Sequence, residues 1–201
     1  MGNKKMSDQH DGRRLRFEHR RSEILDAATA HVLEHGVQAL SLRKLAQSAN
    51  ISHATLLHHF RTRDELVAEI IDQVLARVLA VPEAAVESTD ALRFLWGLVM
   101  ADHGLVPIRV FLEITGMSMF GSEQVRDAVA RSISDRISIV TAALLRAGCP
   151  VHEADALAVS IVAMLRGLVS DLLVTGEVER VTAAFEDFYT VFRARSLAWE
   201  Q

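Results

Sequence analysis

The chain has 201 residues, of which 50% are hydrophobic and 24% charged, and its formal net charge at pH 7 is −4. Three prolines and ten glycines interrupt it so rarely that we expect long helices, enough for one small and one larger domain, with no strand-like alternation and no internal repeat. The lone Cys149 excludes an intramolecular disulfide and a metal–cysteine cluster.

The chain opens with a polar stretch. Residues 1–18 are rich in Lys, Arg, Asp, Gly and His and hold little to bury, which predicts a flexible basic tail. Residues 1–20 also lack the apolar core of a secretory signal, and no uncharged run in the chain approaches the length of a membrane span. We therefore expect a cytoplasmic protein without a membrane partner.

The first helix is predicted from about residue 20 to residue 35. Leu25, Ala28 and Val32 lie on its inner stripe, and Gly36 is placed to end it. This helix should pack its apolar stripe against the elements that follow.

The stretch 41–63, SLRKLAQSANISHATLLHHFRTR, predicts two short helices joined by a tight turn. Ser41 can cap the first of them, and Asn50 tolerates the left-handed backbone that a sharp turn needs. Ser52 can cap the second. The side chains expected to point inward or under the turn are Leu42, Leu45, Ala46, Ala49, Ile51, Leu56 and Phe60.

Polar side chains are left on the outer face of the second short helix, with cations at both ends of the stretch. A short helix that presents such side chains is how a helix-turn-helix reads the DNA major groove, while flanking cations suit contacts to phosphates. A plain helical hairpin would show the same apolar spacing. The residues expected to contact DNA are Ser41, Arg43, Lys44, Ser52, His53, Thr55, Leu57, His58, His59, Arg61 and Arg63.

The charge distribution favours DNA as the partner of the N-terminal part. Residues 1–66 carry a net charge of +3, whereas residues 67–201 carry −7. Cations of the tail could in addition reach a minor groove as an N-terminal arm, or could simply be solvated; they are Lys4, Lys5, Arg13, Arg14 and Arg16.

Over about residues 20–66 the pattern resembles the DNA-binding domain of the tetracycline-repressor (TetR) family of transcriptional regulators. The matching elements are the ILDAA helix, the HG turn, the SLRKLA helix, the IS turn, the TL pair and an exit of the form F-x-x-[KR]-x-x-L. The family usually has Tyr where this chain has Leu57, which cannot donate a hydrogen bond but can pack on a thymine methyl or in the local core. The aromatic residue common two positions later is His59 here.

The resemblance implies an all-α protein of about nine helices. A flexible tail (1–18) precedes a three-helix helix-turn-helix domain (19–66) and a larger helical domain for effector binding and dimerisation (67–201), with helix 67–81 as connector. Thr62 and Glu65 form a capping box that starts this fourth helix. The breakers place the remaining helices at about 89–102, 107–120, 122–148, 152–175 and 178–199.

The last two predicted helices are apolar over arcs wide enough to need two partners. The family builds a four-helix dimer interface from the equivalent pair, so the resemblance implies a homodimer; a deeply buried monomer core is the alternative. The residues assigned to this interface are Leu157, Ile161, Met164, Leu168, Leu172, Phe185, Phe188 and Phe192.

Bulky aromatic and thioether side chains gather in the middle helices. Such residues suit an irregular apolar pocket, although they also suit a filled core, and the family binds small effectors in this region. We expect a small, largely apolar effector. The residues assigned to its site are Phe94, Trp96, Met100, His103, Phe111, Glu113, Thr115, Met117 and Phe120, with Arg109 and Arg166 as further polar candidates.

The resemblance therefore implies a sequence-specific regulator, more often a repressor, that binds a near-palindromic operator in double-stranded DNA and is released by its effector. No nucleophile elbow, phosphate loop or pair of catalytic carboxylates is present, so we expect no enzyme activity, cofactor or metal site. Two alternatives stay open. One is a helical metal-binding protein or enzyme using His53, His58 and His59, whose spacing suits a metal poorly. The other is a non-specific DNA-binding adaptor.

Overall fold

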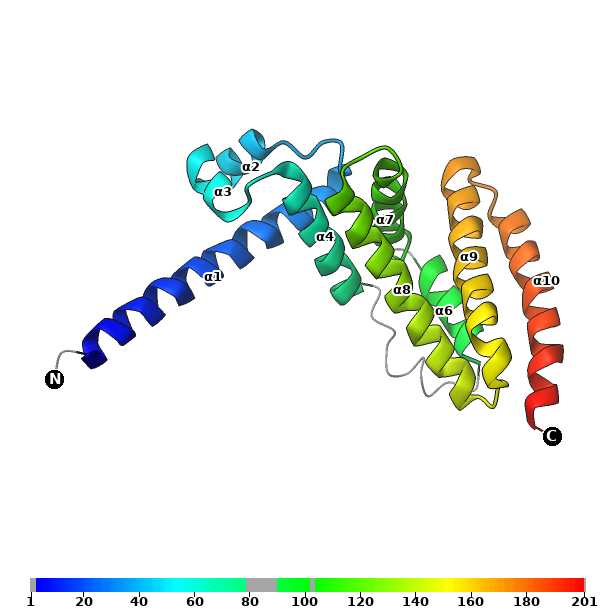
Figure 1. Cartoon of the computed structure of the whole chain (residues 1–201). Helices are drawn as coiled ribbons and strands as arrows, with labels where there is room; N and C mark the ends of the chain where they lie inside the picture. The colour runs from blue at the N-terminus through cyan, green and yellow to red at the C-terminus, as the bar shows by residue number, and fades with distance from the viewer. Residues whose placement is uncertain (1–2, 79–89, 102–103, 201) are drawn as a thin grey trace.

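The computed structural model describes residues 3–78, 90–101 and 104–200, and within them the side chains of all but residues 3–14, 16, 75–78 and 200. These residues form nine α-helices and one short 3-10 turn, with no strand among them (Figure 1). The expected all-α fold of about nine helices is therefore confirmed.

Helix α1 (Asn3–His35) is longer than predicted. From Asn3 onward, the expected flexible tail 1–18 is the first half of this helix, which projects away from the rest of the chain in Figure 1. No proline and only Gly12 interrupt the segment, so its backbone can continue the hydrogen-bonded turns. The helix ends at Gly36, whose φ of 83° is left-handed as predicted. The side chains of the five tail cations lie outside those described.

Three helices complete the N-terminal part: α2 (Leu42–Ser48), α3 (His53–His59) and α4 (Arg63–Val78). The connector helix expected at 67–81 thus begins four residues earlier, and its end beyond residue 78 lies outside the described residues. Thr62 starts α4 as predicted, because its Oγ1 accepts the Glu65 N–H at 3.0 Å. The Glu65 carboxylate in turn accepts the Arg61 N–H at 2.9 Å.

The body consists of α6 (Ala91–Met100), α7 (Leu105–Ser118), α8 (Glu123–Arg146), α9 (Val151–Thr175) and α10 (Val178–Ser196), followed by the 3-10 turn η1 (Leu197–Glu200). α9 packs between α8 and α10 (Figure 1). Gly148 and Gly176 end α8 and α9 with φ of 87° and 71°, as the sequence predicted.

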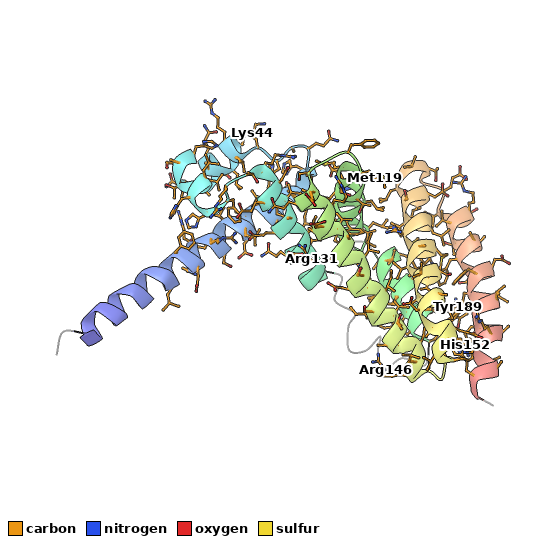
Figure 2. All side chains as sticks on the ribbon, in the orientation of Figure 1. Lys44, Met119, Arg131, Arg146, His152 and Tyr189 are labelled. Atoms are coloured by element: carbon orange, nitrogen blue, oxygen red, sulfur yellow. The ribbon has the colours of Figure 1, made fainter. Side chains whose placement is uncertain are left out.

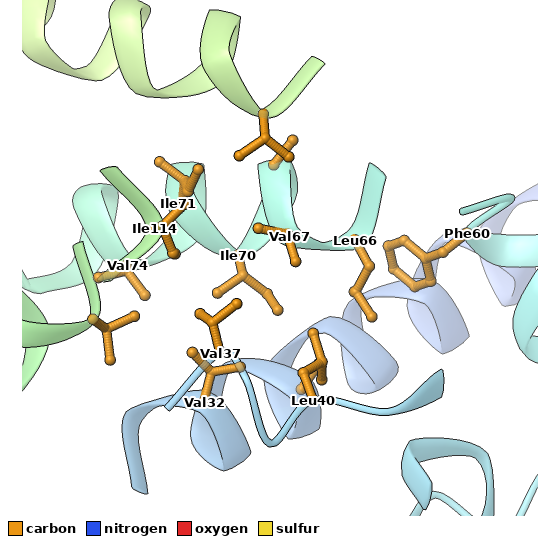
Figure 3. Close-up of a cluster of buried hydrophobic side chains, with 14 of the residues drawn as sticks. Val32, Val37, Leu40, Phe60, Leu66, Val67, Ile70, Ile71, Val74 and Ile114 are labelled. Carbon is orange, nitrogen blue, oxygen red and sulfur yellow. The ribbon is translucent and has the colours of Figure 1, made fainter. Parts of the chain in front are cut away.

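The buried side chains form two clusters. The first joins α1–α4 to α7 and the start of α8, and Figure 3 shows α4 side chains such as Ile70 facing Val32 and Val37, with Ile114 of α7 nearby. The second joins α6 to α8, α9 and α10. The first cluster crosses the boundary expected at residue 66, since Val67, Ile70 and Val74 belong to it. Helices α1–α4 and α7 therefore share one core.

Candidate nucleic-acid interface

The turn between α2 and α3 has the geometry that the sequence predicted. Asn50 is left-handed, with φ of 51°, and is the one described non-glycine residue with positive φ. The Ile51 N–H donates to the Ala46 carbonyl at 2.9 Å, which closes the turn. Ser52 caps α3, since its Oγ accepts the Thr55 N–H at 3.0 Å. The turn thus fixes the angle at which α3 leaves α2.

Helix α3 is anchored on one face and open on the other. Leu56 and Phe60 are completely buried in the first cluster. His53, Thr55 and His58 are exposed, and Leu57 keeps 36% of its surface accessible. The Thr55 hydroxyl already shares a hydrogen bond with the Ser52 hydroxyl at 2.8 Å. A DNA groove could therefore meet two imidazoles, one hydroxyl and one apolar side chain on this face.

Cations surround this face without acidic neighbours in the sequence. Residues 35–63 contain no Asp or Glu. Arg43, Lys44 and Arg61 are exposed, and Lys44 points away from the molecule in Figure 2. Ser41 precedes α2 as expected, but its side chain makes no capping hydrogen bond. The N-terminus of α2 therefore gains no stabilisation from that hydroxyl.

His59 does not belong to the open face, which corrects the sequence prediction. Its side chain is 7% exposed and stacks on Phe17 of α1, with ring centroids 4.4 Å apart. Its Nδ1 is buried and finds no hydrogen-bond partner among the described residues. Burial, and then the neighbouring charge of His58, lower the pKa of His59. Spacing alone placed His59 outward because the long α1, which covers it, was expected to be a tail.

Arg63 is the second correction. It was expected to contact phosphate, but its guanidinium donates to the carbonyls of Val37 and Leu40, at 2.8 Å and 3.3 Å. Both carbonyls lie in the loop between α1 and α2. Arg63 thus ties the start of α4 to this loop through two of its donors.

Behind α3, one arginine links α1 to α4. Arg21 forms an ion pair with Glu69 and lies 3.5 Å from Glu65. Its guanidinium also covers the Phe60 ring, 4.4 Å from the centroid. The sequence prediction missed this brace, because the pairing crosses more than forty residues and leaves no local spacing signal.

The residues assigned to an effector site do not form one group. Trp96 is buried and stacks on Phe185 at 4.5 Å, and Phe111 is buried in the first cluster. Phe120 is 96% exposed and Phe94 36% exposed, so neither lines an interior site. The other assigned residues lie apart from these. Met117 packs on the first cluster and Met100 on the second, and the Thr115 hydroxyl donates to the Phe111 carbonyl. His103 lies outside the described residues.

Glu113 has a specific structural partner. Its two carboxylate oxygens accept the N–H groups of Val37 and Gln38, at 2.9 Å and 3.0 Å. A side chain on Gly36 would come within 3.0 Å of the same carboxylate. Glu113 therefore joins α7 of the body to the loop that leads into α2, the same loop whose carbonyls Arg63 holds.

Four of the eight residues assigned to a dimer interface are buried inside this chain, which corrects the assignment for those four. The inner faces of α9 and α10 pack against α6, α8 and each other, so one chain covers part of the wide apolar stripe. Leu157, Ile161, Leu172 and Phe185 are buried, and Met164, Leu168, Phe188 and Phe192 pack against the same cluster.

The outer face of α9 carries small and aliphatic side chains instead. The most apolar 18-residue window of α9 has a mean hydropathy of 2.0, high enough for a membrane span by length and composition, yet only 28% of it is buried. The exposed residues on this helix include Ala156, Val159, Ser160, Ala163, Gly167 and Val174.

The histidines do not assemble a metal site in the described part of the chain. Among these residues, no group of three or more His, Cys, Asp or Glu side chains could hold a metal ion. His59 faces Phe17 while His53 faces outward at the other end of α3.

Comparison with known proteins finds similar proteins in a family of bacterial regulators and also, at 24% identity over 189 residues, the nucleoid occlusion factor SlmA of Vibrio vulnificus, with 88% of this chain and 95% of that protein covered. Residues 24–70 match the family model described as bacterial regulatory proteins, tetR family. The HTH-type transcriptional repressor KstR2 of Mycobacterium tuberculosis is 37% identical over 83 residues, and the match covers 41% of this chain and 42% of that repressor. The chain thus matches less than half the length of this curated relative.

Two solved structures share the fold over most of the chain. A TetR-family transcriptional regulator from Rhodococcus sp. superposes with a TM-score of 0.66 at 21% identity, covering 86% of this chain and 97% of that one. The multidrug binding protein EbrR, complexed with proflavin, gives a TM-score of 0.63 at 25% identity, with 85% and 98% covered.

Proposed function

Because this chain belongs to the TetR family through its DNA-binding domain and has the fold of family members, we propose that it is a sequence-specific, DNA-binding transcriptional regulator. The observation that carries the proposal is the capped α3, which buries Leu56 and Phe60 and leaves His53, Thr55 and His58 open. A repressor that leaves its operator on binding an effector is the mode we propose, acting in the cytoplasm where bacterial DNA lies.

Specific binding is tested by gel shifts with the DNA upstream of the protein's own gene against scrambled DNA of equal length. A regulator binds the first at least about a hundredfold more tightly, in line with the gap between specific and non-specific affinities. Equal affinity for both would replace the proposal with the non-specific adaptor. Zinc titration with His58→Ala as control tests the metal-binding alternative.

We place the dimer contact on the exposed face of α9. A single reading helix contacts few base pairs, whereas two heads about 34–36 Å apart read a near-palindrome. The small residues of this face allow close approach of a second helix, and covering it would remove apolar surface from water. Ala163→Arg should give a monomer in analytical ultracentrifugation, while Ser134→Arg on the exposed side of α8 should not.

We propose that the Glu113 contact transmits movements of the body to residues 41–63, which we call the reading head. A displacement of α7 would move the carboxylate that holds the N–H groups of Val37 and Gln38, and so the loop before α2. Glu113→Ala should lower operator affinity although Glu113 is not on α2 or α3. Arg109→Ala, an exposed change on the same helix, should leave affinity unchanged.

A further inference from the structure

Arg136, in the middle of α8, forms no ion pair with any residue that the structure describes. Its guanidinium lies 4.8 Å from the centroid of the Phe111 ring, and Nη1 donates to the Ser132 hydroxyl over a long 3.3 Å. Among the described residues no carboxylate forms an ion pair with it. Of the five N–H donors that a guanidinium carries, at most one or two are used by the protein.

A second arginine adds to the uncompensated positive charge at this place. Arg166, on the neighbouring α9, is partly buried and likewise has no ion pair in the described part of the chain. Burial first, and then the positive charge of Arg166, lower the pKa of Arg136 to about 10, although Asp135 opposes the shift. A partly buried charge without an ion-pair partner is unfavourable, which usually marks a role outside the fold itself.

The surroundings of the two arginines are apolar. Phe111 and Ile133 pack with the first buried cluster, whereas Ile137, Val140 and Leu165 pack with the second, so Arg136 lies where the two clusters meet. The place thus combines guanidinium donors for an anion with apolar side chains beside them.

We propose that α7, α8 and α9 bind an organic anion here: a carboxylate, held by Arg136 and Arg166, carried on an apolar body that contacts Phe111. The proposal rests on the function proposed above and names the chemical class of its effector, which the sequence had predicted to be largely apolar. The guanidinium fork matches both carboxylate oxygens, and the Phe111 face keeps it oriented.

The position also connects the anion to DNA binding. Phe111, which lies under the Arg136 guanidinium, is two residues from Glu113 on α7. A carboxylate that draws Arg136 toward Arg166 changes what covers Phe111, and α7 carries that change to the contact with Val37 and Gln38. Anion capture and operator release are thus coupled through one helix.

The test uses decanoate, 2-naphthoate and benzoate as probes, with decanol and decylamine as chain-matched controls, all below micellar concentrations. Binding to the full-length protein is measured by calorimetry and by the rise in Tm. At least one carboxylate should bind, and decanol and decylamine should bind at least tenfold more weakly than decanoate. Arg136→Gln and Arg166→Gln should each weaken carboxylate binding about tenfold or more, while Arg146→Gln, at the exposed end of α8, should not.

The Tm of the ligand-free variants separates recognition from structure. Arg136→Gln loses a ring contact and one long hydrogen bond but also removes a partly buried charge that pairs with no described carboxylate, so its Tm should stay close to that of the wild type. If no carboxylate binds, if decanol binds as well as decanoate, or if Arg136→Gln binds carboxylate normally, the proposal is overturned. Operator gel shifts are run in parallel. If the protein selects its operator but binds no carboxylate, this inference is wrong and the proposed function stands.

Discussion

The two ends of the molecule use arginine in opposite ways. Around α3, Arg43 and Arg61 are exposed and make no ion pair within the described chain. In the outer body each arginine named here joins two helices: Arg93 pairs with Glu186 across α6 and α10, and two others link α9 to α10. These are Arg180 with Asp171 at 2.7 Å and Arg195 with Glu153 at 2.6 Å.

The difference shows what each region is built to meet. A cation that already holds a carboxylate must lose that contact before it can neutralise a phosphate, whereas a solvated cation releases only counterions. The exposed cations around α3, Arg43 and Arg61, are available for an outside anion, whereas Arg93, Arg180 and Arg195 hold helices of the body together. Arg136 and Arg166 differ from these three body arginines because neither forms an ion pair within the described chain, and we assign them an outside anion as well.

The largest predicted effect is on the free energy of unfolding, through the core beneath the reading head. Phe60 is completely buried beneath Arg21, so Phe60→Ala should lower the free energy of unfolding by about 3–5 kcal/mol. Phe120→Ala, at a side chain that is 96% exposed, should change it by less than about 0.5 kcal/mol. Urea unfolding of both variants measures the difference, and similar losses from the two would contradict the assigned core.

Arg63 should differ from the exposed cations near α3, because its guanidinium is already hydrogen-bonded to the backbone. It holds two backbone carbonyls, so Arg63→Ala should lower the free energy of unfolding by about 1.5–3 kcal/mol as well as weakening DNA binding. Thermal and urea unfolding of Arg63→Ala measure the loss. A variant as stable as the wild type would return Arg63 to the set of plain phosphate contacts.

Arg43 should behave in the opposite way. Arg43→Ala should leave unfolding unchanged, weaken binding to many DNA sequences alike, and reduce the slope of log affinity against log salt by about one. Arg93→Ala in the body is its counterpart, expected to lower Tm slightly while leaving DNA affinity unaltered. Fluorescence anisotropy over a salt series measures both, and equal behaviour of the two would remove the contrast.

The smallest effect is a pH dependence within the reading head. Burial lowers the pKa of His59 below its ordinary value of 6.5, so the unfolded chain binds its proton at higher pH than the folded chain does. Stability should therefore fall as pH decreases through about 6.5, by at most about 1.4 kcal/mol per pH unit. His59→Leu should remove this part of the slope in urea titrations from pH 7.5 to pH 5.5.

How much the sequence could predict depended on the range of the interactions. Asn50 and Ser52 act on atoms within five residues of themselves, so the turn and the α3 cap were predictable from the local sequence. The glycines that end helices were predictable for the same reason.

Assignments that depend on a distant partner were less successful. The wide apolar stripes of α9 and α10 were real, but spacing could not tell which part of them α6 and α8 cover. Phe120 and Phe111 have the same side chain, and only the packing of α7 on α4 and α8 decides that one is exposed and the other buried. Glu113 was chosen as a ligand contact because its partners, two N–H groups more than seventy residues away, leave no trace in local sequence.

The most direct test of the account is a selection of bound fragments from random DNA duplexes, run with the wild type and with His53→Ala. The account predicts an enriched near-palindrome with half-sites about one helical turn apart, and an altered preference at one or two positions of each half-site in the variant. Absence of any enriched sequence, or the same preference with a uniform loss of affinity in the variant, would contradict the claim that the open face of α3 reads the bases.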